Sequence, residues 1–113
     1  MKAVIVGPDR GIADALTALD VETVRVDGLA TGESLDAADI AGAALLVITD
    51  TAEATAVPVA KERNPAVRIV LYTPDAVPEF VRGQLDFAVD PDLLAPDVVA
   101  EELSGTLASE GRA

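Results

Sequence analysis

Five short apolar segments, rich in β-branched residues, recur along the chain. They predict strands over residues 3–6, 23–26, 45–49, 68–72 and 87–89. Within the segments 4–6, 45–48 and 69–71, apolar residues follow one another without polar alternation. Such runs are typical of parallel strands that are covered on both faces.

The segments between these strands predict helices. After the first strand, apolar residues recur at the spacing of one helix face, at Ile12, Ala15, Leu16 and Leu19. Asp9 stands before them as a candidate cap. Further helices are expected over residues 34–39, 53–63, 77–84 and 96–107. Pro58 is compatible with the third of these only if that helix begins near it or kinks there.

Strands and helices therefore alternate five times, which predicts an α/β fold. We expect one doubly wound, five-stranded parallel sheet of the Rossmann or flavodoxin-like kind, with helices on both faces. The chain has 113 residues, half of them apolar, and this is enough for one domain over 1–108. Residues 109–113 are expected to form a flexible tail. Ligands of such sheets bind at the carboxyl ends of the strands.

Charge narrows the range of partners. The chain has 20 acidic and 8 basic residues and a net charge of −12, which repels nucleic acid and anionic membrane surfaces. No apolar run approaches the roughly 18 residues that cross a bilayer, so we expect a cytoplasmic protein. The composition, poor in lysine and rich in Ala, Val, Asp and Glu, resembles that of haloarchaeal proteins. We interpret the acidity as an adaptation to high salt, which screens self-repulsion.

The sequence contains neither cysteine nor histidine. This excludes thiol catalysis, Cys or His metal sites, the Ser-His-Asp triad and histidine acid–base chemistry. The acidic pairs near the C-terminal end do not match the spacing of a calcium loop, and no metal site is predicted. We therefore expect a protein that is not an enzyme.

The turn after the first predicted strand is the main candidate for a ligand site. It reads Gly7, Pro8, Asp9, Arg10, Gly11, at the position where dinucleotide folds carry G-x-G-x-x-G and bind pyrophosphate through backbone N–H groups. The match is partial, because Asp9 replaces the middle glycine. The turn is either a degenerate phosphate site for NAD or an adenine nucleotide, or a tight connection with Asp9 as a helix cap.

Three further polar residues follow the second and third predicted strands. Asp27 lies 20 residues after Gly7, where a carboxylate accepts hydrogen bonds from ribose hydroxyls; it is equally typical of a turn with Gly28. Thr49 and Asp50 follow the third strand and either line a pocket or cap the next helix. The segment 73–75, after the fourth strand, has the same two interpretations.

Four more segments join the turn in one family resemblance: VDGLAT at 26–31, ALLVITD at 44–50, AK at 60–61 and DPDLL at 90–94. Together they resemble the TrkA-type (RCK) nucleotide-binding domain. The chain is also similar to small haloarchaeal proteins of unknown function. The resemblance implies a non-catalytic regulatory domain that senses a nucleotide. A strand–helix unit of that family is missing before Thr23. Its loss would give the strand order 2-1-3-4-5 and would match Asp27 to the Asp of a G-D-A-T-like segment.

The order 2-1-3-4-5 is that of response-regulator receivers, which the chain also resembles through Asp50 after the third strand and Thr73 after the fourth. Receivers need an acidic pair after the first strand for magnesium and a lysine after the fifth. Here Asp9 stands alone, and Asp90 precedes a proline where that lysine is expected. The alternative hypothesis is therefore a pseudo-receiver that binds no small molecule. Its partner would be another protein or a second copy, docked on an edge strand.

Overall fold

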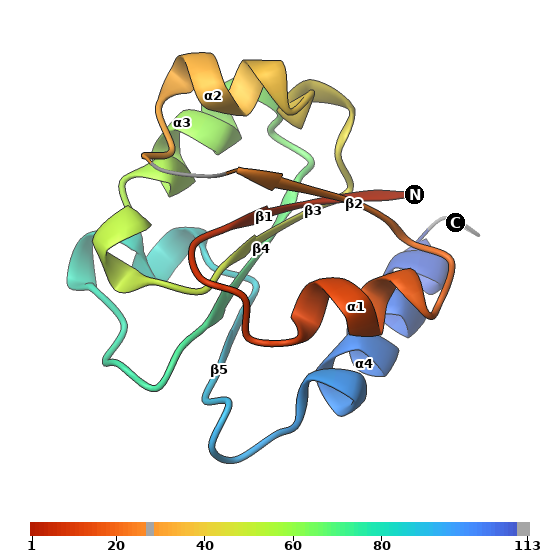
Figure 1. The fold of residues 1–113 in the computed structure, drawn as a ribbon. Helices are drawn as coiled ribbons and strands as arrows, with labels where there is room; N and C mark the ends of the chain where they lie inside the picture. Colours follow the sequence, from red (N-terminus) through yellow and green to blue (C-terminus); the bar gives the residue numbers. More distant parts are fainter. Residues whose placement is uncertain (27–28, 111–113) are drawn as a thin grey trace.

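The computed structural model describes residues 1–26 and 29–110 (Figure 1). Its strands are β1 (Lys2–Val6), β2 (Glu22–Val26), β3 (Leu45–Ile48), β4 (Arg68–Tyr72) and β5 (Phe87–Val89). They form one sheet in the order β2-β1-β3-β4-β5, and every neighbouring pair is parallel. The predicted fold class and strand order are confirmed, and each strand boundary differs from the predicted one by at most one residue.

Helices cover both faces of this sheet (Figure 1). On one face lie α1 (Ile12–Thr17) and α4 (Pro96–Glu110), which contact each other. On the other lie α2 (Gly32–Ala37), α3 (Ala56–Arg63) and the 3-10 helix η3 (Glu79–Gln84). The shorter 3-10 helices η1 (Ile40–Gly42) and η2 (Thr51–Glu53) flank β3. Helix α4 thus includes the first two residues of the predicted tail, and 111–113 lie outside the described residues.

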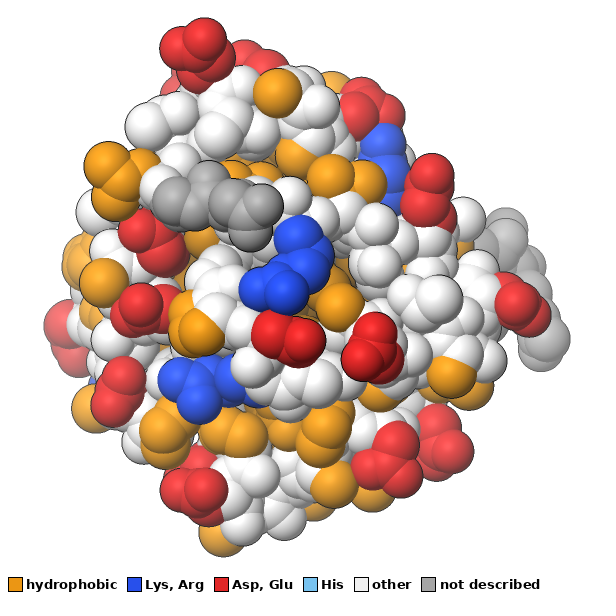
Figure 2. All heavy atoms as spheres, viewed as in Figure 1, with side chains coloured by type: hydrophobic (Ala, Val, Ile, Leu, Met, Phe, Trp, Pro, Cys, Tyr) orange, Lys and Arg blue, Asp and Glu red, His pale blue; other side chains and the backbone are white. Residues whose placement is uncertain are grey.

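The surface reflects the charge balance of the sequence. On the face seen in Figure 2, acidic side chains are scattered widely, whereas basic side chains are few and lie beside acidic ones. Among the described helices, none combines the length and the hydropathy that a bilayer crossing requires.

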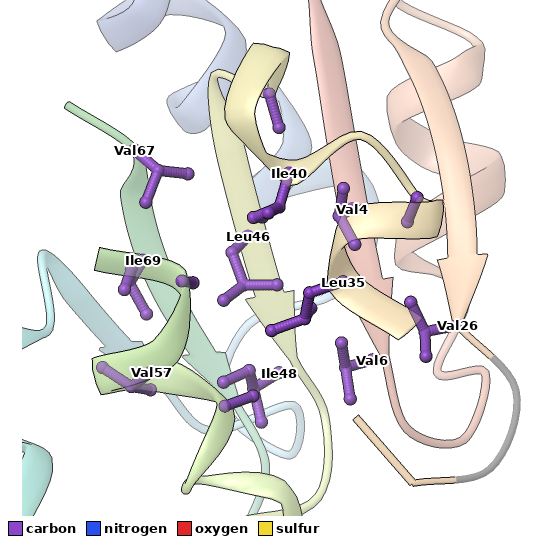
Figure 3. Close-up of a cluster of buried hydrophobic side chains, with 14 of the residues drawn as sticks. Val4, Val6, Val26, Leu35, Ile40, Leu46, Ile48, Val57, Val67 and Ile69 are labelled. Atoms are coloured by element: carbon purple, nitrogen blue, oxygen red, sulfur yellow. The ribbon is translucent and has the colours of Figure 1, made fainter. Parts of the chain in front are cut away.

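The three central strands, β1, β3 and β4, are buried on both faces, as their unbroken apolar sequences predict. Val4 and Leu46, both fully buried, point toward α2 and α3 in a cluster that also includes Ile69 (Figure 3). Ile5 follows Val4 in β1, and Val47 follows Leu46 in β3. Both belong to the second cluster, on the face of the sheet that α1 and α4 cover. Because successive side chains in a strand alternate between faces, two covered faces require two apolar sets in each strand.

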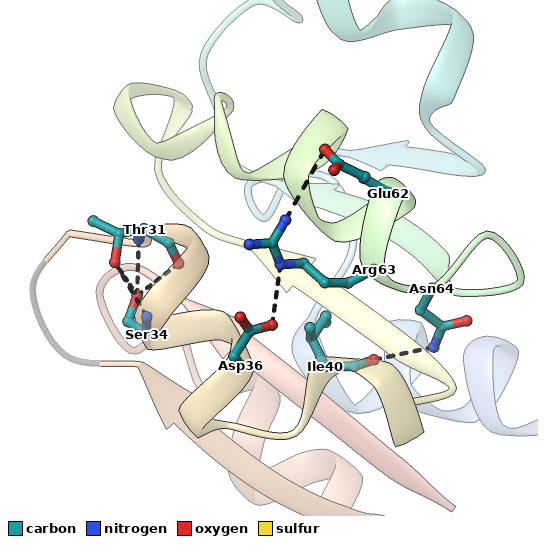
Figure 4. Close-up of polar contacts among 7 residues, drawn as sticks. All are labelled: Thr31, Ser34, Asp36, Ile40, Glu62, Arg63 and Asn64. Atoms are coloured by element: carbon teal, nitrogen blue, oxygen red, sulfur yellow. Dashed lines mark hydrogen bonds and ion pairs between the residues drawn. The ribbon is translucent and has the colours of Figure 1, made fainter.

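The second helix begins earlier than predicted. Thr31 is its N-cap and Ser34 its third residue, and each side chain bonds the other's backbone N–H in a capping box (Figure 4). Arg63 of α3 donates to Asp36 of α2 over 3.0 Å, and the Asn64 side chain donates to the carbonyl of Ile40 over 3.0 Å. Polar contacts thus join the end of α3 to α2 through Arg63 and to η1 through Asn64.

The predicted helix over 53–63 is in fact η2 followed by α3, which begins at Ala56. Pro58 is the third residue of α3. The first N–H groups of a helix have no intrahelical acceptor, so a proline there removes no bond. Of the two conditions under which Pro58 is compatible with this helix, a start near the proline is the one that the structure shows.

The predicted helix over 77–84 is wrong in type, since this segment forms the 3-10 helix η3 from Glu79. Pro78 precedes it in an extended conformation, and only Val81 within it is buried. One buried side chain does not make the apolar stripe that holds an α-helix against a sheet. The segment after β4 is therefore a short cover, which leaves β5 partly exposed.

Candidate functional site

The β1–α1 turn passes very close to the end of β3. Gly7 has φ 109° and Gly11 has φ 84°, conformations that L side chains rarely adopt. A Cβ atom at Gly7 would lie 2.4 Å from Thr49 Oγ1 and 3.2 Å from the Asp50 nitrogen. Gly7 is thus required by the close approach of the two segments, whether or not a ligand binds there.

Asp9 occupies the turn itself. Its Oδ1 accepts the Gly11 N–H over 2.7 Å, and its Oδ2 lies 3.8 Å from Arg25 Nη1. The predicted role of Asp9 as N-cap of the first helix is wrong: Gly11 occupies that position, and no side chain caps it. Asp9 instead closes the turn before the helix and takes up an N–H group that a phosphate would need.

Thr49 and Arg10 tie the turn to β3. The Thr49 side chain is fully buried, and its hydroxyl donates to the carbonyls of Pro8, over 2.7 Å, and Val6, over 3.2 Å. Arg10 Nε donates to the carbonyl of Thr49 over 2.9 Å. The structure therefore places Thr49 beside the predicted site residues of this turn. These residues form hydrogen bonds with one another.

The remaining predicted site residues are Asp50 and Asp27. Asp50 caps η2, where its Oδ1 accepts the Ala52 N–H over 2.9 Å, as in one of its two predicted roles. Asp27, predicted for ribose binding or for a turn, lies outside the described residues. Arg25 of β2 donates to the carbonyl of Gly7 over 3.1 Å.

A hollow of about 210 Å³ lies at the carboxyl ends of β4 and β5. Its lining includes Thr73, Asp75, Val77, Ala88 and Asp90. Asp75 Oδ2 accepts a hydrogen bond from the Thr73 hydroxyl over 3.3 Å, so its carboxylate is partly engaged. The sequence predicts a candidate segment at 73–75 and none at Asp90. The position of Asp90 directly after the fifth predicted strand is the signal that points to it.

Tyr72, which ends β4, fixes the loop that follows β5. Its hydroxyl donates to the carbonyl of Leu94 over 2.9 Å, and its side chain is fully buried. Burial raises the pKa of this phenol above its ordinary value of 10.0; Arg10 lowers it, and Asp97 and Asp90 raise it. The direction of the net shift is upward, so the neutral phenol is the form that the fold favours.

We expect ionisation of Tyr72 to destabilise the fold. Because the folded-state pKa is raised, the contribution to stability is complete below pH 10.0 and is lost as the pH rises through the folded-state pKa. Tyr72 is the only tyrosine of the sequence, so tyrosinate absorbance reports it directly. The midpoint should lie higher in native protein than in urea-denatured protein; an equal or lower native midpoint would contradict the prediction.

The chemistry available in the part of the chain that the structure describes is limited. No group of three or more carboxylates is placed to hold a metal ion. The turn residues donate to and accept from each other, and α1 has only six residues beyond the turn. This geometry suits a rigid surface better than a site that must exchange a ligand.

Residues 3–103 match the model of a family described as a family of unknown function, DUF7126. The chain belongs to DUF7126. The comparison of this DUF7126 chain with curated proteins finds no match.

Solved structures share the fold of this DUF7126 protein. An orphan response regulator of H. pylori is 15% identical, with a TM-score of 0.73, over 95% of this chain and 96% of that chain. An atypical orphan response regulator, described as having a phosphorylation-independent regulatory mechanism, is 16% identical, with a TM-score of 0.73 and 96% of each chain covered. A Burkholderia thailandensis protein described under pilus assembly (CpaE) is 19% identical, with a TM-score of 0.69, over 96% and 98%.

At these identities the likeness concerns the fold alone. The DUF7126 fold is that of receiver and CpaE-like domains with a flavodoxin-like sheet, and the comparisons do not single out the TrkA-type domain. The expectation of TrkA-type descent is thus replaced by a broader one, a likeness in fold to receiver and CpaE-like domains.

Proposed function

We propose that this protein is a non-catalytic, receiver-like interaction module, whose strand-end turn is closed to nucleotides and to phosphoryl transfer. The observation that carries the proposal is the closure of the β1–α1 turn by its own side chains. Asp9 takes the Gly11 N–H, and Arg10 and Thr49 bond the backbone across the β1–β3 junction. A phosphate bound through the Gly11 N–H would have to displace the Asp9 carboxylate.

The receiver resemblance supports the same proposal through its departures. Asp50, in the place of a phosphoacceptor, caps η2 with one of its carboxylate oxygens. Asp90, in the place of the receiver lysine, accepts the Asp92 N–H over 2.8 Å. With a carboxylate there instead of an ammonium group, the site lacks the cation that would stabilise an aspartyl phosphate. The fold relative with phosphorylation-independent regulation offers a precedent for signalling without that chemistry.

The competing function, a sensor of NAD or an adenine nucleotide, would use the turn 7–11 with Asp27, Thr49 and Asp50. It requires turn N–H groups that converge on an open pocket. The contacts of Asp9 and Thr49 favour the interaction module instead.

A thermal-shift titration in multimolar KCl tests the choice. The ligands are NAD, NADH, ATP, ADP, AMP, cyclic dinucleotides, and acetyl phosphate with magnesium. We expect no concentration-dependent rise in melting temperature and no phosphoryl adduct by intact mass. A ligand at about 100 times its Kd would stabilise the fold by about 2.7 kcal/mol, which is readily measured.

Two control variants give each alternative its own signature. A nucleotide-induced shift that is lost in Asp27→Ala would establish the sensor. An adduct with acetyl phosphate that is lost in Asp50→Asn would establish a working receiver. Either result would overturn the proposed function.

A further inference from the structure

The segment between β4 and β5 covers the sheet with very little buried surface. We call residues 74–85 the strap. Val81 is the one strap residue whose side chain is buried; four others are half-buried, and the rest are exposed. In β3, by contrast, every residue is buried. Because apolar burial is the main force that holds a segment in place, the strap is held weakly.

The local structure of the strap adds little to its stability. The 3-10 helix η3 spans six residues and has no side-chain cap. Hydrogen bonds of 3-10 helices have poorer geometry than those of α-helices, and long runs are uncommon for this reason. Arg82 forms an ion pair with Glu79 over 3.6 Å, but both are exposed and both belong to the strap. This pair therefore does not tie the strap to the sheet.

Two hollows lie where the strap meets β5. The hollow of about 210 Å³ at the carboxyl ends of β4 and β5 is the first, and a second, of about 240 Å³, includes Arg82 and Leu85 in its lining. Val77 of the strap and Ala88 of β5 line both hollows. Atoms that face a hollow lack dispersion contacts on that side. The strap thus packs loosely against β5, and Val81 anchors it in the apolar cluster beside α3.

The two ends of the strap are firmly held. Before it, the buried Thr73 donates its N–H to the Val89 carbonyl over 3.2 Å. After it, the Asp86 N–H donates to the Ile69 carbonyl over 2.8 Å, and the Asp86 carboxylate accepts the Ile69 N–H over 2.8 Å and Arg68 Nη1 over 2.9 Å. A weakly held segment between two firm ends can leave the sheet and return while β4 and β5 stay paired.

We propose that the strap opens as a unit, about hinges at Thr73 and Asp86, while the five-stranded sheet stays folded. Opening withdraws Val81 from its cluster and uncovers apolar surface of β4. This surface includes Leu71, which is 1% exposed in the closed fold and lines a hollow together with Val77. The strap is thus a cover that controls access to one side of the sheet. Such local opening is typical of segments with few buried apolar contacts.

Thiol labelling tests the opening directly. The sequence contains no cysteine, so a single introduced thiol is a unique reporter. Val81→Cys places it under the strap, and the matched control Val47→Cys places it at an equally buried position of β3. Dithionitrobenzoate in molar KCl then reacts with the thiol only when an opening exposes it. Circular dichroism of each variant establishes that it is folded.

We expect Val81→Cys to be labelled about tenfold faster than Val47→Cys, or more. Its rate should also depend only weakly on urea, because the slope scales with the surface that an opening exposes. Val47→Cys should react only through global unfolding, with a steep dependence on urea. Equal rates with equal urea dependence at the two positions would overturn the proposal.

A pair of glycine substitutions locates the opening in the strap. Gly83 lies in η3 and Gly105 in α4, neither has a positive φ, and an added Cβ at either meets no atom within 4 Å. Gly83→Ala restricts the open strap and should slow labelling of Val81→Cys by about two- to fivefold. Gly105→Ala should leave that rate unchanged, because α4 stays folded when the strap opens. Equal slowing by the two substitutions would show that Val81 is exposed only by global unfolding.

Hydrogen exchange of the wild type provides a test that needs no introduced thiol. The backbone N–H groups of η3 should exchange together, at a rate that depends weakly on urea, and well before those of β3 and β4. Exchange of η3 at the rate of β3, with the same dependence on urea, would overturn the proposal. This measurement decides the matter even if Val81→Cys fails to fold.

Discussion

Replacing Leu46 with alanine should lower the free energy of unfolding by about 2–5 kcal/mol. Leu46 is fully buried at the centre of β3, and its register places it between Val4 of β1 and Ile69 of β4 (Figure 3). Strands on both sides hold the backbone, so the cavity left by the lost side chain has little freedom to collapse. Urea unfolding in multimolar KCl, followed by circular dichroism, measures the change.

Leu93→Ala is the matched control for this prediction. Leu93 is 80% exposed in the loop before α4, so the same deletion should change stability by no more than about 0.5 kcal/mol. Equal losses at Leu46 and Leu93 would contradict the described core. A loss at Leu93 that appears only at high protein concentration would instead indicate that this loop takes part in association.

Gly7→Ala should destabilise the protein by about 3 kcal/mol or more. The alanine would have to adopt φ 109°, and its Cβ would lie 2.4 Å from the Thr49 hydroxyl oxygen. The second obstacle cannot relax cheaply, because the Thr49 side chain is fully buried and hydrogen-bonded to the Pro8 carbonyl. Typical domains are stable by about 5–15 kcal/mol in total, so the loss is a large share. Urea unfolding again provides the measurement.

Two controls separate the causes of that loss. Gly105→Ala on α4, where an added Cβ meets no atom within 4 Å, should be neutral or stabilising by up to about 1 kcal/mol. In a double-mutant cycle, Thr49→Ala should relieve part of the cost of Gly7→Ala by removing the clashing oxygen, and the residual cost reports the backbone strain. Strict additivity would refute the contact between the turn and β3.

The turn 7–11 illustrates why a phosphate motif needs its three-dimensional context. By sequence it is both a degenerate nucleotide turn and a tight connection, since glycines at its ends serve either purpose. The contacts support the tight connection: Gly7 makes room for Thr49, and Asp9 accepts the Gly11 N–H. An interaction module keeps such a turn rigid, whereas a sensor would keep its N–H groups available.

The sequence by itself determined the sheet. Unbroken apolar runs such as Leu45–Ile48 predict buried parallel strands because covered strands need apolar residues on both faces, and this requirement is local. The alternation with helices then predicts the α/β class. Local chemistry also predicted one of two roles for Asp50, as a cap, because a capping carboxylate bonds an N–H only two residues away.

Only the tertiary structure decided the state of the candidate site and of the edges. The bonds of Thr49 to Pro8 and of Arg10 to Thr49 join residues 41 and 39 positions apart, and they exist because β1 and β3 are neighbours. Likewise, the segment after β4 is a 3-10 helix with little to bury, which leaves β5 open. Periodicity carries no information about such distant contacts, because it reports which face of an element is buried and not what lies against it.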